Sequence, residues 1–273
     1  MKPNAPPDDH ESGGDLNTHA ARAGEIGTLA SSLARARARL VDVAARPNAI
    51  REIGELLLKW GRDQEAARFL AGIADIAEHD AHLAFMLGWA SFACGKYKDA
   101  ERFAVLALSK DLGNPEHWLL CAEAAWAQGE LAKAAEFLDR MLSSFPDNQN
   151  ALMRLGQLHL SAGNFREAIA FCNKVIAIDA SMSTPFATRA RAHNLLGEHV
   201  EADASYQTAV ALDVREISGG RNSFIGYGNF LRETGRSKAA VELFLKWLPE
   251  RPSYAGSGDL ALARLTAGQL GDA

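Results

Sequence analysis

Histidine and cysteine are the residue types in this chain whose spacing could support metal or nucleophilic chemistry. The sequence holds eight histidines and three cysteines, but it contains no HExxH motif and no His/Cys cluster at zinc-ligand spacing. His159 and His193 lie 34 residues apart, and semi-buried packing explains that pair better than a shared metal does. We therefore predict no catalytic residue, no metal site and no cofactor site.

The three cysteines and the glycine-rich segments are also predicted to be chemically inert. Cys94, Cys121 and Cys172 form no CxxC pair, and their odd number argues against a disulfide framework. They are predicted to be reduced thiols in the core. The segment GSGD at 256–259 is too short to cradle a phosphate and follows no predicted strand. No GxSxG, Walker or kinase signature is present, so the chain is predicted not to be an enzyme.

Composition excludes several classes of partner. The 273 residues are 48% hydrophobic and 23% charged, as expected for a folded protein. A net charge of −5 disfavours nucleic acid and anionic membranes, which need a basic surface. No apolar run approaches the roughly 20 residues of a membrane span. Residues 1–25 are polar and lack the apolar core of a secretory signal. They are predicted to be a disordered leader, and the protein is predicted to be cytoplasmic.

The elements that position the side chains follow a 34-residue repeat. Glycines recur at this spacing: Gly61, Gly95, Gly129, Gly163 and Gly197. Five residues after each glycine stands an alanine, and seven residues before it stands a glycine or an alanine. A sixth copy follows around Gly235, displaced by four residues. Small residues at three fixed offsets in six copies indicate one repeated packing unit.

Each unit is predicted to be a pair of helices. In the second unit, Ala84, Leu87, Gly88 and Ser91 fall at the i, i+3, i+4, i+7 spacing of one helical face. Gly95 then supplies a turn, because glycine adopts positive φ without a Cβ penalty. The small residues allow the two helices of a pair to approach closely, and a larger side chain there would push them apart.

This pattern resembles the tetratricopeptide repeat, whose units carry W-x2-L-G-x2-Y and A-x3-F blocks and a closing proline. Here WLLCAEAA at 118–125 and LMRLGQLH at 152–159 match the first block, AAEFL at 134–138 matches the second, and Pro146 matches the proline. The resemblance implies an all-α, right-handed superhelical solenoid of antiparallel helix pairs. We place six units, at 47–80, 81–114, 115–148, 149–182, 183–216 and 221–254.

The two ends depart from the repeat. Residues 26–46 are predicted to form a capping helix or a degenerate repeat, with Leu29 and Leu33 on its packing side and its arginines in solvent. Residues 255–273 match the first part of a seventh unit, which stops five residues after Gly268. Because a half repeat exposes an apolar face, we expect the chain to be an excised part of a longer protein.

The resemblance also predicts where a partner binds. In such proteins the first helix of each pair lines a concave groove, largely through four offsets of the unit. Carried over to this chain, those offsets predict an apolar half-groove followed by an amide and basic half. The partner-binding candidates are Phe85, Trp89, Phe92, Leu119, Trp126, Met153, Gln157, Arg191, Asn194, Asn229 and Arg232.

Two interpretations of the aromatic residues stay open. Phe85, Trp89 and Phe92 form a second apolar stripe on a helix that already has a stacking face. The stripe either docks an apolar helix or peptide or packs against neighbouring helices. Arg191 and Arg232 would favour an acidic or carboxylate-bearing end of the ligand. The groove lacks the lysines of the family's carboxylate clamp, for which Arg191, Asn194 and Asn229 would be only a partial substitute.

Three functions fit these features. The first is a non-enzymatic scaffold that binds a peptide or helix of a partner protein in the concave groove. The second is an N-terminal targeting or substrate-recruitment module of a larger bacterial enzyme, sulfotransferase-like or glycosyltransferase-like, whose catalytic part would lie beyond residue 273. The third is self-association through the half repeat at 255–273. The sequence does not name the partner.

Overall fold

The computed structural model describes residues 27–42, 45–213 and 221–247. The predicted leader and the partial seventh repeat lie outside the described residues, so the predictions made for them are not tested. The chain divides into two compact units, residues 1–128 and residues 129–273.

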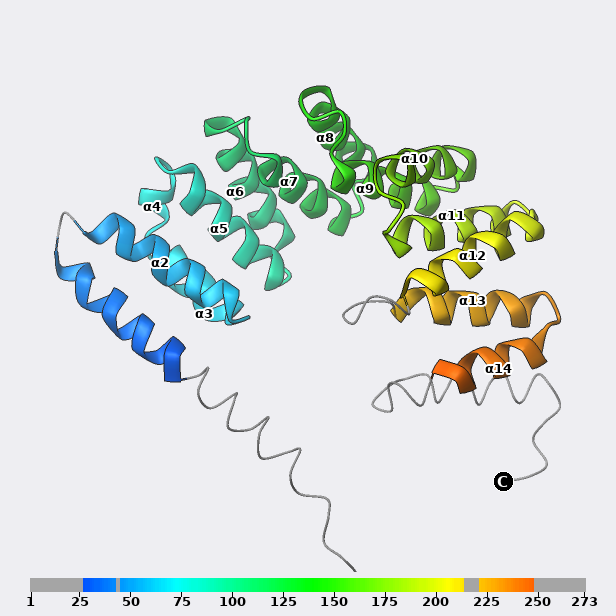
Figure 1. Cartoon of the computed structure of the whole chain (residues 1–273). Coiled ribbons are helices and arrows are strands. Elements are labelled where there is room, and N and C mark those ends of the chain that lie inside the picture. The colour runs from blue at the N-terminus through cyan, green and yellow to red at the C-terminus, as the bar shows by residue number, and fades with distance from the viewer. Residues whose placement is uncertain (1–26, 43–44, 214–220, 248–273) are drawn as a thin grey trace, which may run out of the picture. The chain divides into compact units, whose positions relative to one another are not determined.

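The first unit is built from helices alone within its described residues. A helix spans 27–38 and runs into a short 3-10 helix, η1. Helices α2 to α7 follow (Figure 1). Helix α5 contacts α2, α3, α4, α6 and α7, and contacts also join α2 to α3 and α6 to α7. Their bounds are η1 Arg39–Val41, α2 Arg46–Lys59, α3 Asp63–Ala71, α4 Ala74–Ala77, α5 Ala81–Ala93, α6 Tyr97–Lys110 and α7 Pro115–Ala127.

The second unit repeats the same arrangement. Its consecutive helices contact each other, and α11 also contacts both α9 and α13, the first helices of the flanking pairs. The bounds are α8 Leu131–Ser144, α9 Gln149–Ser161, α10 Phe165–Ile178, α11 Ser183–Leu195, α12 His199–Asp213, α13 Arg221–Glu233 and α14 Ser237–Trp247. Every regular element in the described part of the chain is helical, which confirms the all-α, tetratricopeptide-like fold class.

The repeated small residues make the turns and the close helix contacts. Gly61, Gly95, Gly129, Gly163, Gly197 and Gly235 all have φ between 65 and 81°, so each ends a first helix in a conformation that favours glycine. The alanines five residues further on are fully buried in all six copies. Ala84, Leu87, Gly88 and Ser91 are buried as well, which confirms the predicted stacking face.

The start of a first helix is fixed by a capping side chain in three consecutive copies. Asp80 accepts hydrogen bonds from the backbone N–H groups of His82 and Leu83. Asn114 and Asn148 cap α7 and α9 in the same way. Such caps satisfy amide groups that have no partner inside the helix, and they hold each first helix at a defined rotation.

The N-terminal helix covers the first repeat. Leu29, Leu33 and Ala36 of the helix at 27–38 are buried in one cluster with Ile53 and Leu57 of α2. The neighbouring arginines, Arg35, Arg37 and Arg39, are exposed. This confirms the predicted packing side and the solvated arginine face.

The second helix of the first repeat is shorter than the others. It ends at Ala71, and the separate short helix α4 follows at Ala74. Gly72 stands at the break, where the later copies have Leu106, Arg140, Lys174 and Thr208. Glycine lowers helix propensity by about 1 kcal/mol relative to alanine, and it weakens the helix at this point.

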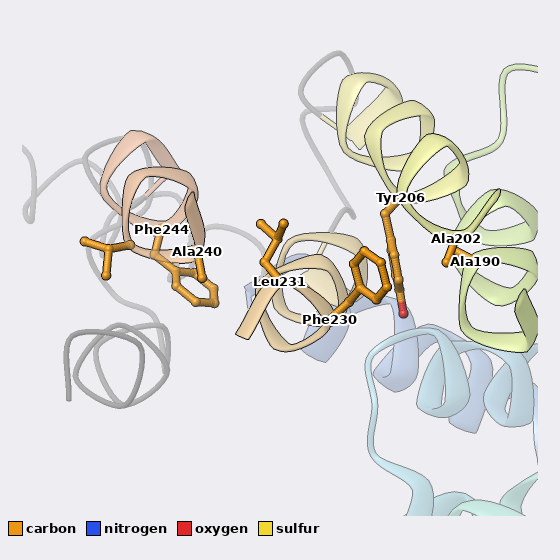
Figure 2. Packing of buried hydrophobic residues seen from close by; sticks show 8 residues of the cluster. Ala190, Ala202, Tyr206, Phe230, Leu231, Ala240 and Phe244 are labelled. Carbon is orange, nitrogen blue, oxygen red and sulfur yellow. The ribbon is translucent and has the colours of Figure 1, made fainter. Parts of the chain in front are cut away.

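Aromatic side chains fill the core between the last pairs of the second unit. Tyr206 of α12 lies against Phe230 of α13, with ring centroids 5.4 Å apart. Phe244 of α14 and Leu231 of α13 extend the same cluster, as Figure 2 shows. Ala190 and Ala202 complete it where α11 and α12 cross. The fold therefore buries one face of each first helix and leaves the other to the surface.

Candidate functional site

Helix α5 carries two apolar faces that differ in burial. Its stacking face includes Leu83 and Met86, which are both buried with α2 and α3 side chains. The other face carries Phe85, Trp89 and Phe92. Trp89 is 43% exposed, and its two neighbours are half-buried. An exposed tryptophan beside half-buried rings is unusual for a surface with no binding role.

The aromatic rings form a continuous row along this face. Ring centroids are 5.3 Å apart for His117 and Phe85, 6.5 Å for Phe85 and Trp89, 6.1 Å for Trp89 and Phe92, and 5.5 Å for Phe92 and Tyr97. Contacts at these separations stabilise one another by about 0.5–1.5 kcal/mol per pair. The row is therefore held in place before any ligand arrives. We call Phe85, Trp89, Phe92 and Tyr97 the aromatic strip.

The two ends of the strip differ in burial. His117 of α7 is buried, and its Nδ1 lies 3.0 Å from the backbone oxygen of Asp111, which fixes the ring under Phe85. Tyr97, at the start of α6, is 37% exposed. The strip therefore runs from a packed end near α7 to an open end at the turn between α5 and α6.

Neighbouring apolar side chains on α7 are also partly accessible. Leu119 and Trp126 are half-buried. Trp118, on another face of α7, is buried and donates its Nε1–H to the backbone oxygen of Leu112 at 3.1 Å. The tryptophan of the repeat signature is therefore structural, while Trp126 retains accessible surface next to the helix that carries the strip.

The candidates of the second unit have a different character. Met153 is 7% exposed and packs with Leu152, Cys172 and Val175, so it offers little surface to a partner. Gln157 is half-buried and accepts a hydrogen bond from Arg154 at 3.2 Å.

The polar candidates at the end of the chain contact one another or an acidic neighbour. Asn194 donates to Glu233 at 3.2 Å, and Arg232 donates to Asn229 at 3.0 Å. Arg191 is exposed. The repeat positions did not predict the carboxylate of Glu233 next to Asn194. This negative charge weakens the attraction that Arg191 and Arg232 were expected to exert on an acidic ligand.

Two members of the aromatic row, Tyr97 and His117, were not predicted from the sequence. Tyr97 belongs to a second helix and His117 falls at a non-lining offset, so the repeat offsets did not select them. The signal available was the position of Tyr97, two residues after the glycine that turns the chain back toward α5.

His159 and His193 each contact a neighbouring side chain of the same unit. His159 is half-buried and stacks on Phe171 with centroids 5.3 Å apart, and His193 Nδ1 lies 2.7 Å from Glu198. The hydrogen bond from His193, together with the nearby Arg166, holds the pKa of Glu198 below its ordinary value. No group of three or more metal-ligating side chains occurs among the described residues. Both histidines thus pack as predicted.

The cysteines are free thiols with different exposure. Cys121 and Cys172 are buried, whereas Cys94 is half-buried at the end of α5. Burial raises the pKa of Cys172 to about 12, so its thiol is not a nucleophile at neutral pH. The prediction of buried core thiols is confirmed for two of the three.

Comparisons with known proteins agree with the repeat. Two sequence models described as tetratricopeptide repeat match residues 85–148 and 125–197. No curated protein sequence matches the chain. In the part of the chain that the structure describes, no helix combines the length and apolarity that a bilayer crossing requires.

Several solved structures share the fold. A tetratricopeptide repeat protein from Parabacteroides merdae is 16% identical, with a TM-score of 0.69 over 93% of this chain and 98% of that one. A MamA structure from Desulfovibrio magneticus is 20% identical, with a TM-score of 0.54 over 64% of this chain and 97% of that one.

A third similar structure comes from a larger chain. The APC/C hetero-tetramer Cut9–Hcn1 is 16% identical, with a TM-score of 0.63 over 89% of this chain but only 47% of that chain. At these identities the likeness shows the fold alone.

Proposed function

Because the chain belongs to the tetratricopeptide-repeat family, we propose that it is a non-enzymatic scaffold that binds a segment of a partner protein on the aromatic strip. The observation that carries this proposal is the second face of α5, where Trp89 is 43% exposed in a row of contacting rings. Stacked helix pairs leave their first helices free to line a binding surface. One of the similar structures is itself a hetero-tetramer, which is in keeping with this use of the fold.

The strip suits an apolar ligand segment. Tryptophan and tyrosine are enriched among residues that dominate binding energy, because they bury large area with little loss of side-chain freedom. Burial of apolar surface contributes roughly 25 cal/mol per Å², from which ordering costs must be subtracted. Micromolar affinity, about −8 kcal/mol, is the expected scale for a single segment.

The test is selection of binding peptides from a displayed random library, followed by affinity measurement with variants of the protein. Peptides that use the strip should carry leucine or aromatic residues. They should bind Trp89→Ala about 30-fold more weakly, which corresponds to the roughly 2 kcal/mol of a hot-spot residue.

Val105→Ala is the matched control. Val105 lies on α6 and is 42% exposed, nearly the same as Trp89, but it belongs to no aromatic contact of the strip. Its replacement should leave binding unchanged. Peptides that bind Trp89→Ala as tightly as the unaltered protein would remove the strip as the binding surface.

A further inference from the structure

The two ends of the aromatic strip carry opposite charges. At the start of α5, His82 Nε2 lies 2.9 Å from the Oε1 atom of Glu55, which comes from α2. The Glu55 side chain is 58% exposed. A carboxylate is therefore held at the end of the strip that begins with Phe85, and it remains accessible to a ligand.

Glu116 is a second acidic residue near this end of the strip in the sequence. Glu116 is exposed and immediately precedes His117, whose ring contacts Phe85. Helix α5 contacts both α2, which carries Glu55, and α7, which carries Glu116.

Positive charges gather at the opposite end. Lys96 and Lys98 are exposed and flank Tyr97, whose ring contacts Phe92. Lys59, also exposed, lies in the last turn of α2. Because α6 begins directly after the turn that ends α5, Lys96 and Lys98 flank the open end of the strip, where the nearby Asp99 is paired with Arg102.

We propose that the strip binds a charge-segregated segment of a partner protein. That segment has an apolar centre, lysine or arginine at the end that lies over the start of α5, and aspartate or glutamate at the end that lies over Tyr97. The inference rests on the proposed function, and it adds the ligand's charge pattern and its orientation. Complementary charges at the rim select among apolar ligands and fix their register, while like charges exclude them.

The experiment uses three synthetic peptides with one shared apolar core of leucine and phenylalanine. The mixed peptide has lysines at one end and glutamates at the other, and the two comparison peptides have lysines at both ends or glutamates at both ends. Binding to the full chain is measured by fluorescence anisotropy at low and high salt. The variants are Glu55→Gln/Glu116→Gln, Lys96→Gln/Lys98→Gln and Trp89→Ala.

The mixed peptide should bind most tightly, by about threefold to tenfold at low salt, which is the scale of two or three exposed ion pairs. The advantage should shrink at high salt because exposed charges are screened. The double glutamine change at Glu55 and Glu116 should weaken only the peptides that contain lysine. The change at Lys96 and Lys98 should weaken only those that contain glutamate. A control pair that removes the same charge from exposed positions on α12 and α14, Glu201→Gln/Glu242→Gln, should change nothing.

Two other outcomes would overturn the inference, and they separate it from the proposed function. If all three peptides bind equally and all lose affinity with Trp89→Ala, the strip is the binding surface but the charges do not select the ligand. If no peptide depends on Trp89, the proposed binding surface is wrong and the charge inference falls with it.

Discussion

Glycines at the crossings of the paired helices differ in how much space surrounds them. A Cβ atom on Gly156 would lie 3.4 Å from Cys172 Sγ and 3.6 Å from the backbone oxygen of Ala168, which are ordinary contacts. A Cβ on Gly228 would lie 2.1 Å from a ring carbon of Phe244. That ring is 1% exposed in a packed cluster, so it has no room to move. Two positions that are equivalent in the repeat are thus different in tolerance.

Opposite effects on stability are expected for one substitution at these two sites. Gly156→Ala should raise stability by about 0.5–1 kcal/mol, because alanine is the better helix former and restricts the unfolded chain. Gly228→Ala should lower it by about 1–3 kcal/mol through overpacking. Urea unfolding of both variants is the measurement, and a shift of both midpoints in the same direction would contradict the spacing argument.

Gly88 has less space around it than Gly156 has. Its Cβ would meet Leu120 at 3.0 Å and the backbone oxygen of Ala100 at 3.2 Å. A leucine side chain at this position must displace the α6 backbone itself, so Gly88→Leu should cost about 1–3 kcal/mol or more. Thermal unfolding checks this, and an unchanged melting temperature would refute the assigned packing face.

Thiol chemistry provides an independent reading of burial at single residues. Since burial raises the pKa of Cys172 to about 12, its thiolate is negligible at pH 8, whereas Cys94 is half-buried. Iodoacetamide should therefore modify Cys94 first, and Cys121 and Cys172 only after unfolding. Peptide mass spectrometry gives the order. Alkylation of Cys172 in the folded protein at the rate of Cys94 would show that the α9 and α10 pair opens.

At the scale of the helix, the capping residue Asp80 has two functions. It caps α5, and it pairs with Arg51 of α2. Burial raises the pKa of its carboxyl, but hydrogen bonds from Arg51 and from the backbone N–H groups of Leu83 and His82 outweigh burial and lower the pKa below its ordinary value. The strip-bearing helix is thus positioned by a group that must be ionised to act.

The contribution of Asp80 should depend on pH. A pKa lowered in the folded state stabilises the protein fully above the unfolded value of about 3.9 and loses that effect as the pH falls through the folded value. Asp80→Ala should cost about 1 kcal/mol near pH 7, and the difference from the unaltered protein should shrink below about pH 4. Unfolding measured from pH 7 down to pH 3 tests this, and a constant difference would exclude ionisation as the cause.

Helix pairs were predictable from the sequence because glycine and alanine recur at fixed offsets in every copy. The exposure of individual side chains in each copy was less predictable. Met153 shares its offset with Phe85 and Leu119, yet its flexible side chain fills a gap in the core. Repeat offsets assign equal exposure to equivalent positions, whereas packing depends on the neighbours that each copy happens to have. The contact between Tyr97 and Phe92 also depends on the side chains of one copy, and the repeat positions do not predict it.

At the scale of the whole molecule, a repeat protein can place a proposed binding face and a packing face on opposite sides of one helix. Among the described residues, the helices of each compact unit mainly contact their sequence neighbours and the first helices of adjacent pairs, so we expect a substitution to act locally. Helix α5 shows the separation most clearly. Met86 faces α2 and is 2% exposed, while Trp89 on the other face is 43% exposed.

These two residues should therefore fail in different ways when they are truncated. Met86→Ala should cost about 2–5 kcal/mol of stability because it opens a cavity against α2, and any loss of peptide binding should disappear under conditions that keep the variant folded. Trp89→Ala should cost less than about 1.5 kcal/mol, because much of its ring is already in water, but it should lose binding at both low and high salt. Unfolding and peptide affinity are measured on the same preparations of each variant. If Trp89→Ala loses as much stability as Met86→Ala, the aromatic residues act as core and the binding surface must be sought elsewhere. A stable variant that no longer binds would place the function of α5 on the face that packing does not require.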